Sequence, residues 1–117
     1  MITDRELLEM ATKAAGIVID KSPANGGGNG NTGFDLAGNA MLDWHSGAKW
    51  NPLEDDGDAF RLLRQVDYGL LVEDGTVKIM NKLGGCVFFA DINGTDEMSV
   101  IRRAITSAAA AKAWSQP

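Results

Sequence analysis

Apolar side chains recur at helical spacing in three stretches of the chain, which predicts three amphipathic helices. The first begins at Thr3, because Thr3 and Glu6 have the spacing of a capping box, and it ends at Gly16. The second begins near residues 55–56 and the third near residues 95–96, where aspartate or threonine can cap a helix. The side chains expected to face the core are Leu7, Leu8, Ala11, Ala14 and Ala15 in the first helix, Ala59, Phe60, Leu63 and Val66 in the second, and Met98, Ile101, Ile105 and Ala108 in the third.

β-prone residues between these helices predict strands. The dipeptide Asp74-Gly75 separates Gly69–Glu73 from Thr76–Met80, which is the strongest short-range signal for a two-residue hairpin. Residues 86–90 form a continuous apolar run, which predicts a strand in a central position of the sheet. Two further strands are expected at residues 17–19 and within residues 40–44.

The predicted element order is α-β-β-α-β-β-β-α, which is typical of an α+β fold. We expect one mostly antiparallel sheet of four or five strands packed against three helices. The length of 117 residues suits one domain, residues 1–117. Residues 22–33 carry no apolar side chain larger than alanine or proline, which predicts a mobile loop rich in glycine and asparagine. The C-terminus is expected to fray from about residue 114.

The charge of the chain changes the list of expected partners. The net charge is -5, from 16 acidic and 11 basic residues, which argues against direct nucleic-acid binding. One cysteine can form no internal disulfide, and no apolar run approaches the roughly 20 residues of a membrane span. The polar N-terminus lacks the pattern of a signal peptide. We therefore expect a cytoplasmic protein without a membrane partner.

The glycines at positions 28, 30 and 33 match the dinucleotide fingerprint GxGxxG. In a nucleotide site this motif directly follows a strand and opens a helix, and neither is predicted here. A mobile surface loop is the main interpretation, and closure of this loop over an anion through backbone N–H groups is the alternative. The loop residues that could take part are Asn25, Gly28, Asn29, Gly30 and Asn31.

Residues with catalytic or metal-binding chemistry are few. The acids within residues 54–58 lack the spacing of a calcium loop and are explained by helix capping. His45 and Cys86 make no recognisable zinc set, and free cysteine is usually a buried small hydrophobe. The sequence therefore predicts no catalytic residue, no metal site and no cofactor.

Tryptophan is the remaining residue type with functional meaning, because it anchors both small cores and binding surfaces. Trp44 and Trp50 flank a polar stretch that includes His45 and Lys49, and these four residues are the candidate partner-binding surface. Core packing of the two tryptophans is the alternative. Trp114 could pack across a homodimer.

Three segments also carry a resemblance. DRELLEMATKAAG at residues 4–16, WNPLEDDGDAFR at residues 50–61 and RRAITSAAA at residues 102–110 together resemble a group of small phage and prophage proteins. That group is similar in layout to the phage α-β-α sandwich domains and is mostly of unknown function. The resemblance covers about half of the chain, and residues 22–39 look like an insertion relative to it. It implies a phage gene expressed in a bacterial cytoplasm and transfers no catalytic residue.

These observations lead to two functional hypotheses. The first is a non-enzymatic phage accessory protein that binds a host protein, including an inhibitor of antiviral defence of the anti-CRISPR kind. The second is a protein that binds or sequesters a small ligand or nucleotide through its glycine-rich loop.

Overall fold

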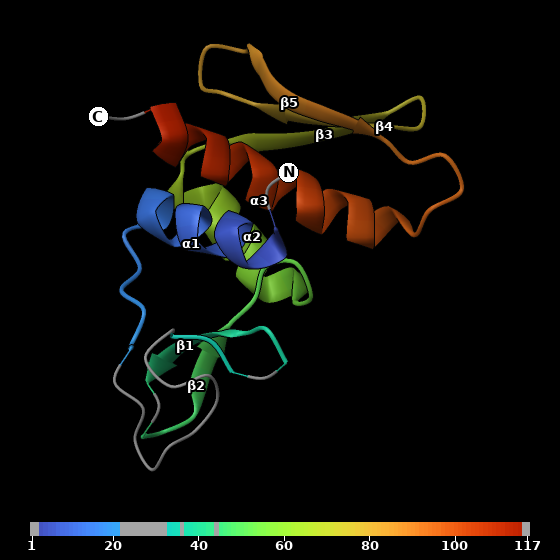
Figure 1. Ribbon diagram of the computed structural model, residues 1–117. Helices are drawn as coiled ribbons and strands as arrows, with labels where there is room; N and C mark the ends of the chain where they lie inside the picture. Colours follow the sequence, from blue (N-terminus) through green and yellow to red (C-terminus); the bar gives the residue numbers. More distant parts are fainter. Residues whose placement is uncertain (1–2, 22–32, 36, 44, 116–117) are drawn as a thin grey trace.

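The structure is a computed structural model that describes residues 3–21, 33–35, 37–43 and 45–115, with side chains through Ala113. Three helices and five strands confirm the predicted α+β class and element order (Figure 1). The elements are α1 (Asp4–Ala15), β1 (Ala40–Asp43), β2 (Ala48–Trp50), α2 (Asp56–Gln65), β3 (Gly69–Glu73), β4 (Thr76–Met80), β5 (Cys86–Asp91) and α3 (Glu97–Ser115).

Helix α3 lies in the middle of the molecule, between the three-stranded sheet and the pair α1 and α2 (Figure 1). It is therefore buried on more than the one face expected from its sequence. Thr106, a polar residue outside the expected core stripe, is fully buried, and its hydroxyl donates to the Arg102 carbonyl at 2.8 Å. The residues of α3 that are buried are Ile101, Ala104, Ile105, Thr106, Ala108, Ala109 and Ala110.

The β3–β4 hairpin has the predicted register. Asp74 and Gly75 take φ angles of 52° and 72°, the positive values that a tight two-residue hairpin turn requires. Glu73 pairs with Thr76, and the antiparallel ladder continues to the far end of both strands. Val77 and Ile79 share the face of β4 that is turned toward the core, as predicted, and both are fully buried.

The five strands are divided between two antiparallel sheets, whereas one sheet was expected. β1 pairs with β2, and the second sheet has the order β3-β4-β5. β5 is consequently an edge strand, so its predicted central position is wrong. β4 occupies the centre because each of its neighbours joins it through a short turn, at residues 74–75 and 81–85.

Residues 17–19 are not a strand, although their β-branched side chains favour one. A backbone hydrogen bond from the Asp20 N–H to the Met41 carbonyl, at 2.8 Å, joins the neighbouring residue to β1. β2, which was not predicted, takes this place in the element order. The buried face of α2 also differs from the prediction, because Leu62 is fully buried while Phe60 is 39% exposed.

The predicted helix caps are present. Thr3 and Glu6 form both hydrogen bonds of a capping box, and the bond from the Thr3 N–H holds the pKa of Glu6 below its usual value. Gly16 ends α1 with a φ of 74°. Asp55 caps α2 by accepting from the Asp58 N–H, and Asp96 accepts from the Ser99 N–H at the start of α3. Local polar side chains therefore define where each helix begins.

Candidate functional site

Trp50 does not share an exposed surface with His45 and Lys49, as the expected tryptophan surface requires. Trp50 is only 4% exposed and belongs to the main hydrophobic core, so its assignment to a binding surface is wrong and the core alternative holds. Its burial follows from its place at the end of β2, where the chain enters the core. His45 and Lys49 are exposed. Trp44 lies outside the described residues.

The loop residues of the ligand hypothesis also lie outside the described part of the chain. They are Asn25, Gly28, Asn29, Gly30 and Asn31. Gly33, the last glycine of the motif, is described and has a structural role. Its φ is 81°, its carbonyl accepts from the Met41 N–H at 2.8 Å, and an added Cβ would lie 2.3 Å from Ile19 Cγ2. Glycine is therefore required here by the backbone and by close packing.

The acids that follow residue 54 include a helix cap, as predicted, and they also form ion pairs. Asp55 accepts from the Asp58 N–H at 2.9 Å, and Asp58 pairs with Arg61 at 2.7 Å. Asp56 pairs with Arg102 of α3 at 2.6 Å. Within the described ranges, no group of three or more histidine, cysteine, aspartate or glutamate side chains could hold a metal ion.

Asn51 explains why the WNPL segment has a structural role. Its N–H donates to Asp58 Oδ2 at 2.9 Å, which joins β2 to the first turn of α2. Its side chain donates to Asn39 Oδ1 at 3.1 Å and accepts from the Leu53 N–H at 3.1 Å. The side chain is almost fully buried, and these bonds satisfy it. The segment that carries part of the resemblance thus connects β1, β2 and α2.

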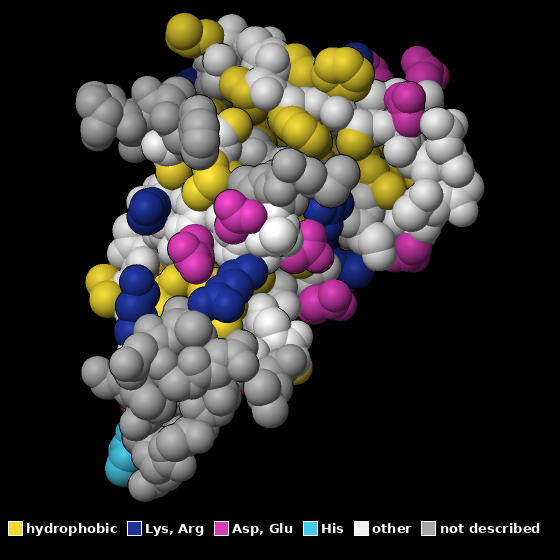
Figure 2. All heavy atoms as spheres, viewed as in Figure 1, with side chains coloured by type: hydrophobic (Ala, Val, Ile, Leu, Met, Phe, Trp, Pro, Cys, Tyr) yellow, Lys and Arg dark blue, Asp and Glu magenta, His cyan; other side chains and the backbone are white. Residues whose placement is uncertain are grey.

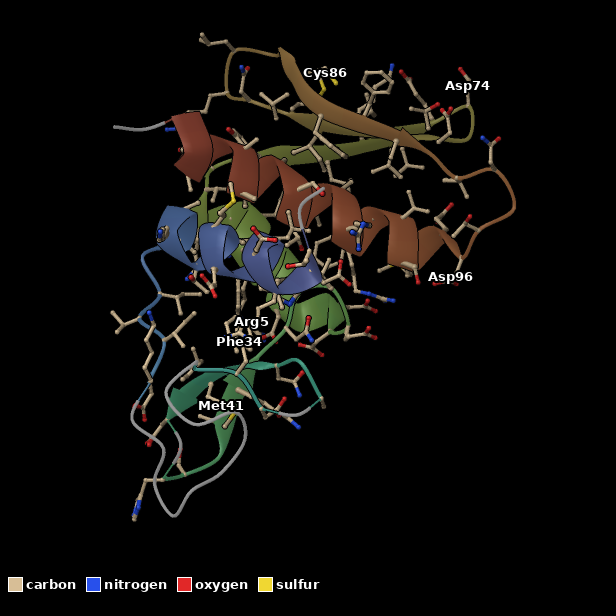
Figure 3. All side chains as sticks on the ribbon, in the orientation of Figure 1. Arg5, Phe34, Met41, Asp74, Cys86 and Asp96 are labelled. Carbon is tan, nitrogen blue, oxygen red and sulfur yellow. The ribbon has the colours of Figure 1, made fainter. Side chains whose placement is uncertain are left out.

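His45 and Cys86 lie at opposite ends of the molecule. The histidine is at the lower tip in Figure 2, and Cys86 is at the top in Figure 3. The N–H of His45 donates to Asp43 Oδ1 at 2.9 Å, and this bond is the main reason that the pKa of Asp43 is lowered. Cys86 is exposed, so its expected burial is wrong. The pair cannot act on one substrate in this arrangement.

The structure instead presents an apolar surface on the sheet, which we call the outer face. It is the side of β3, β4 and β5 turned away from α3, at the top of Figures 1 and 2. The alternation of side chains along each strand assigns its residues. They are Leu71 and Glu73 of β3, Thr76, Lys78 and Met80 of β4, and Cys86, Phe89 and Asp91 of β5.

The centre of the outer face is a row of three residues that pair across the strands. Leu71 pairs with Lys78, and Lys78 pairs with Phe89. Phe89 is 66% exposed and Leu71 is 41% exposed, which is unusual for large apolar side chains in a regular sheet. Val87, which lies at the irregularity between β4 and β5, adds a third exposed apolar side chain. Among the described residues, no element covers this row.

Charged groups border the apolar row. The Lys78 ammonium lies 2.9 Å from Glu73 Oε1, and this hydrogen bond is the main cause of the raised pKa of Lys78. Thr76 Oγ1 lies 3.3 Å from Asp91 Oδ1 at the same end of the sheet. The outer face therefore combines exposed apolar side chains with charged groups, and protein–protein contact surfaces also contain both kinds.

Sequence reasoning missed this surface, although a signal for it exists. Leu70, Leu71 and Val72 are consecutive apolar residues in β3, and Phe88 and Phe89 are consecutive in β5. Consecutive apolar residues in a strand place apolar groups on both faces, and α3 can cover only one of them. The apolar excess on the second face was interpreted as burial in the centre of a sheet.

No protein-family model, curated protein or solved structure matches this chain. No helix in the described part of the chain is long and apolar enough to cross a membrane.

Proposed function

We propose that this protein is a non-enzymatic accessory protein that binds another protein through the outer face of its three-stranded sheet. The observation that supports the proposal best is the row of Leu71, Lys78 and Phe89, which has a largely exposed aromatic ring at one end. Burial of this row against a partner removes apolar area from water, which is the main driving force of protein association. Aromatic residues at the centre of a contact surface commonly supply much of the binding energy.

The polar margin supports specificity. Lys78 lies between the two apolar side chains, and Glu73 and Asp91 lie at one end of the outer face, so a partner must offer apolar groups together with complementary charges. The net charge of -5 favours a partner with a basic surface, because unlike charges accelerate encounter.

The biological setting comes from the resemblance to small phage and prophage proteins. It favours a host protein in the bacterial cytoplasm as the partner, and inhibition of a defence component as the outcome. The protein would then act by occupying a surface of its target, which is consistent with the structural roles of Asp55, Asp58 and Asn51.

The test starts from capture of a partner from host lysate, followed by calorimetry on the purified pair. We expect Phe89→Ser to weaken binding by at least about tenfold, which corresponds to about 1.4 kcal/mol. Phe60→Ser is the matched control, since Phe60 is an exposed phenylalanine on α2, away from the outer face. Equal affinity of the Phe89→Ser variant and the wild type would contradict the proposal.

The second hypothesis, a small-ligand binder, depends on Asn25 and the glycines near residue 30, which the structure does not describe. It stays a prediction from the sequence. A thermal-shift screen with nucleotides tests it, because a ligand at 100 times its dissociation constant raises the stability by about 2.7 kcal/mol.

A further inference from the structure

β5 is an edge strand, and no strand in the described part of the chain pairs with its free side. The Ile92 N–H donates to the Gly75 carbonyl at 2.9 Å, which identifies the residues of this segment that bond to β4. The side to which a residue points its backbone N–H and C=O groups alternates along an antiparallel strand. Phe88 and Ala90 therefore direct these groups toward β4. Phe89 and Asp91 direct theirs away from the sheet. Two residues of β5 therefore offer donors and acceptors to an additional strand.

This edge has little of the protection that proteins commonly give an exposed strand. Edges are usually blocked by proline, lysine or a bulge. β5 contains neither proline nor lysine, and its one charged residue is Asp91 at the end. The irregularity in the β4–β5 register lies at the other end, near Cys86, so the stretch from Phe88 to Asp91 is regular and open.

A groove runs below this edge, between β5 and α3. Its volume is about 210 Å³, and it is mostly apolar. The residues that line it are Phe88, Ala90 and Asp91 of β5 and Val100, Arg103, Ala104 and Ser107 of α3. A strand added to β5 thus finds backbone partners at the edge and room for its inward side chains in the groove.

We propose that the strand that occupies this edge is β5 of a second copy of the chain. This inference goes beyond the proposed function, because it uses the edge of the sheet and leaves the outer face open. β5 complements itself in antiparallel pairing with Phe89 on the two-fold axis. Phe89 then lies opposite the partner's Phe89 on the outer face, and such aromatic cross-strand pairs are favourable. On the inner side, Phe88 lies opposite the partner's Ala90, so a large side chain meets a small one above the groove.

The position of α3 fits the same pairing. α3 packs against β4 and β5, and strands lie about 4.8 Å apart, so β5 pairing places the two α3 helices about 10 Å from each other. Helices pack at separations of about 8–10 Å. The α3 residues on this side include the small Ala104 and Ser107, and Arg103 on the same side pairs with Asp4 of α1. The product is a six-stranded sheet with one continuous outer face and two Phe89 rings at its centre.

The first experiment measures the mass of the protein in solution by light scattering after size exclusion, over the micromolar to submillimolar range. The wild type is expected to approach twice the 12.5 kDa of the chain as the concentration rises. Phe89→Lys places two like charges on the axis and is expected to remain monomeric. Leu71→Lys is the matched control, since Leu71 lies on the same face but on β3, and it is expected to dimerise like the wild type. A monomeric wild type at all concentrations, or a dimeric Phe89→Lys variant, overturns the proposal.

The second experiment tests the register and does not depend on the folding of a lysine variant. Paired residues of this kind have Cα atoms about 5.5 Å apart, which is within the span of a disulfide. Phe89→Cys in a Cys86→Ser background is expected to form an intermolecular disulfide under mild oxidation. Leu71→Cys in the same background is expected to remain reduced. A dimeric wild type whose Phe89→Cys variant does not cross-link contradicts pairing through β5.

The two proposals fail separately. A Leu71→Lys variant that dimerises but no longer binds the host partner supports both of them. If it keeps the host partner and still dimerises, the proposed use of the outer face fails and the dimer stands. If the wild type is monomeric and Leu71→Lys loses the host partner, the dimer fails and the outer face stands.

Discussion

The two faces of the three-stranded sheet have similar apolar content and opposite environments. On the inner face, Val77 and Ile79 are fully buried under α3, and Val72 at the margin of this face is 39% exposed. On the outer face, Leu71 and Phe89 stay largely exposed, and only Lys78 separates them. The inner residues account for folding, because their burial removes apolar area from water within the chain. The outer residues contribute little in this way, so their apolar character is better explained by contact with another molecule.

The largest expected change in the free energy of unfolding comes from a substitution on the inner face. Ile79→Ala should lower the free energy of unfolding by about 3 kcal/mol, because it leaves a cavity in a fully buried site. Lys78→Ala, the adjacent residue on the outer face, should change it by less than about 0.5 kcal/mol. Urea denaturation followed by circular dichroism measures both. Similar losses of unfolding free energy for the two variants would mean that the inner and outer faces contribute equally to folding.

The next effect tests how α3 is held in place over the inner face. The Arg102 guanidinium donates to the Leu53 carbonyl at 3.0 Å and to Asp56 at 2.6 Å, and its side chain is mostly buried. Arg102→Ala should cost about 2 kcal/mol, since hydrogen bonds to charged groups in partly buried sites are among the stronger ones. Arg103→Ala is the control, because its pair with Asp4 is exposed and should be worth less than about 0.5 kcal/mol. The same denaturation assay compares the two.

A smaller effect is expected for stability on the outer face itself. Phe89→Ser should change the free energy of unfolding by less than about 1 kcal/mol in dilute solution, because the ring is already in water. Phe88→Ser should cost more, since Phe88 packs against the core. Thermal unfolding at low protein concentration distinguishes them. A Phe89→Ser variant as unstable as Phe88→Ser would assign Phe89 to folding.

The smallest effect concerns pH. Asp96 accepts hydrogen bonds from the N–H and hydroxyl of Ser99, which lower its pKa. A lowered folded-state pKa means that this contribution is present at neutral pH and is lost as the pH falls below about 4. Asp96→Asn keeps an acceptor at the cap but does not titrate. The unfolding free energy of this variant should therefore fall less steeply with acidification than that of the wild type, and an equal slope would refute the assignment.

Features that depend on neighbouring residues were predictable from the sequence. The hairpin at Asp74 and Gly75 and the caps at Thr3 and Asp55 follow from turn and capping chemistry over three or four residues. The structure has them where the pattern predicts them.

Features that depend on contacts between segments far apart in the sequence could not be predicted from local patterns. The apolar run at residues 86–90 has the composition of a central strand, and only the position of α3 shows that β5 is an edge with one uncovered side. Trp50 could belong to a core or a surface until β2 placed it in the core. Residues 17–19 have β-branched side chains but are not assigned as a strand, although Asp20 bonds to Met41 of β1.

The central position of α3 has a consequence for biosynthesis. This helix is the last element of the order described, yet it covers the inner face of the sheet on one side and packs against α1 and α2 on the other. While residues 97–115 are still inside the ribosome, the emerged segments lack the surface against which they pack. The hairpin and the first two helices therefore gain most of their packing partners only after residues 97–115 have emerged.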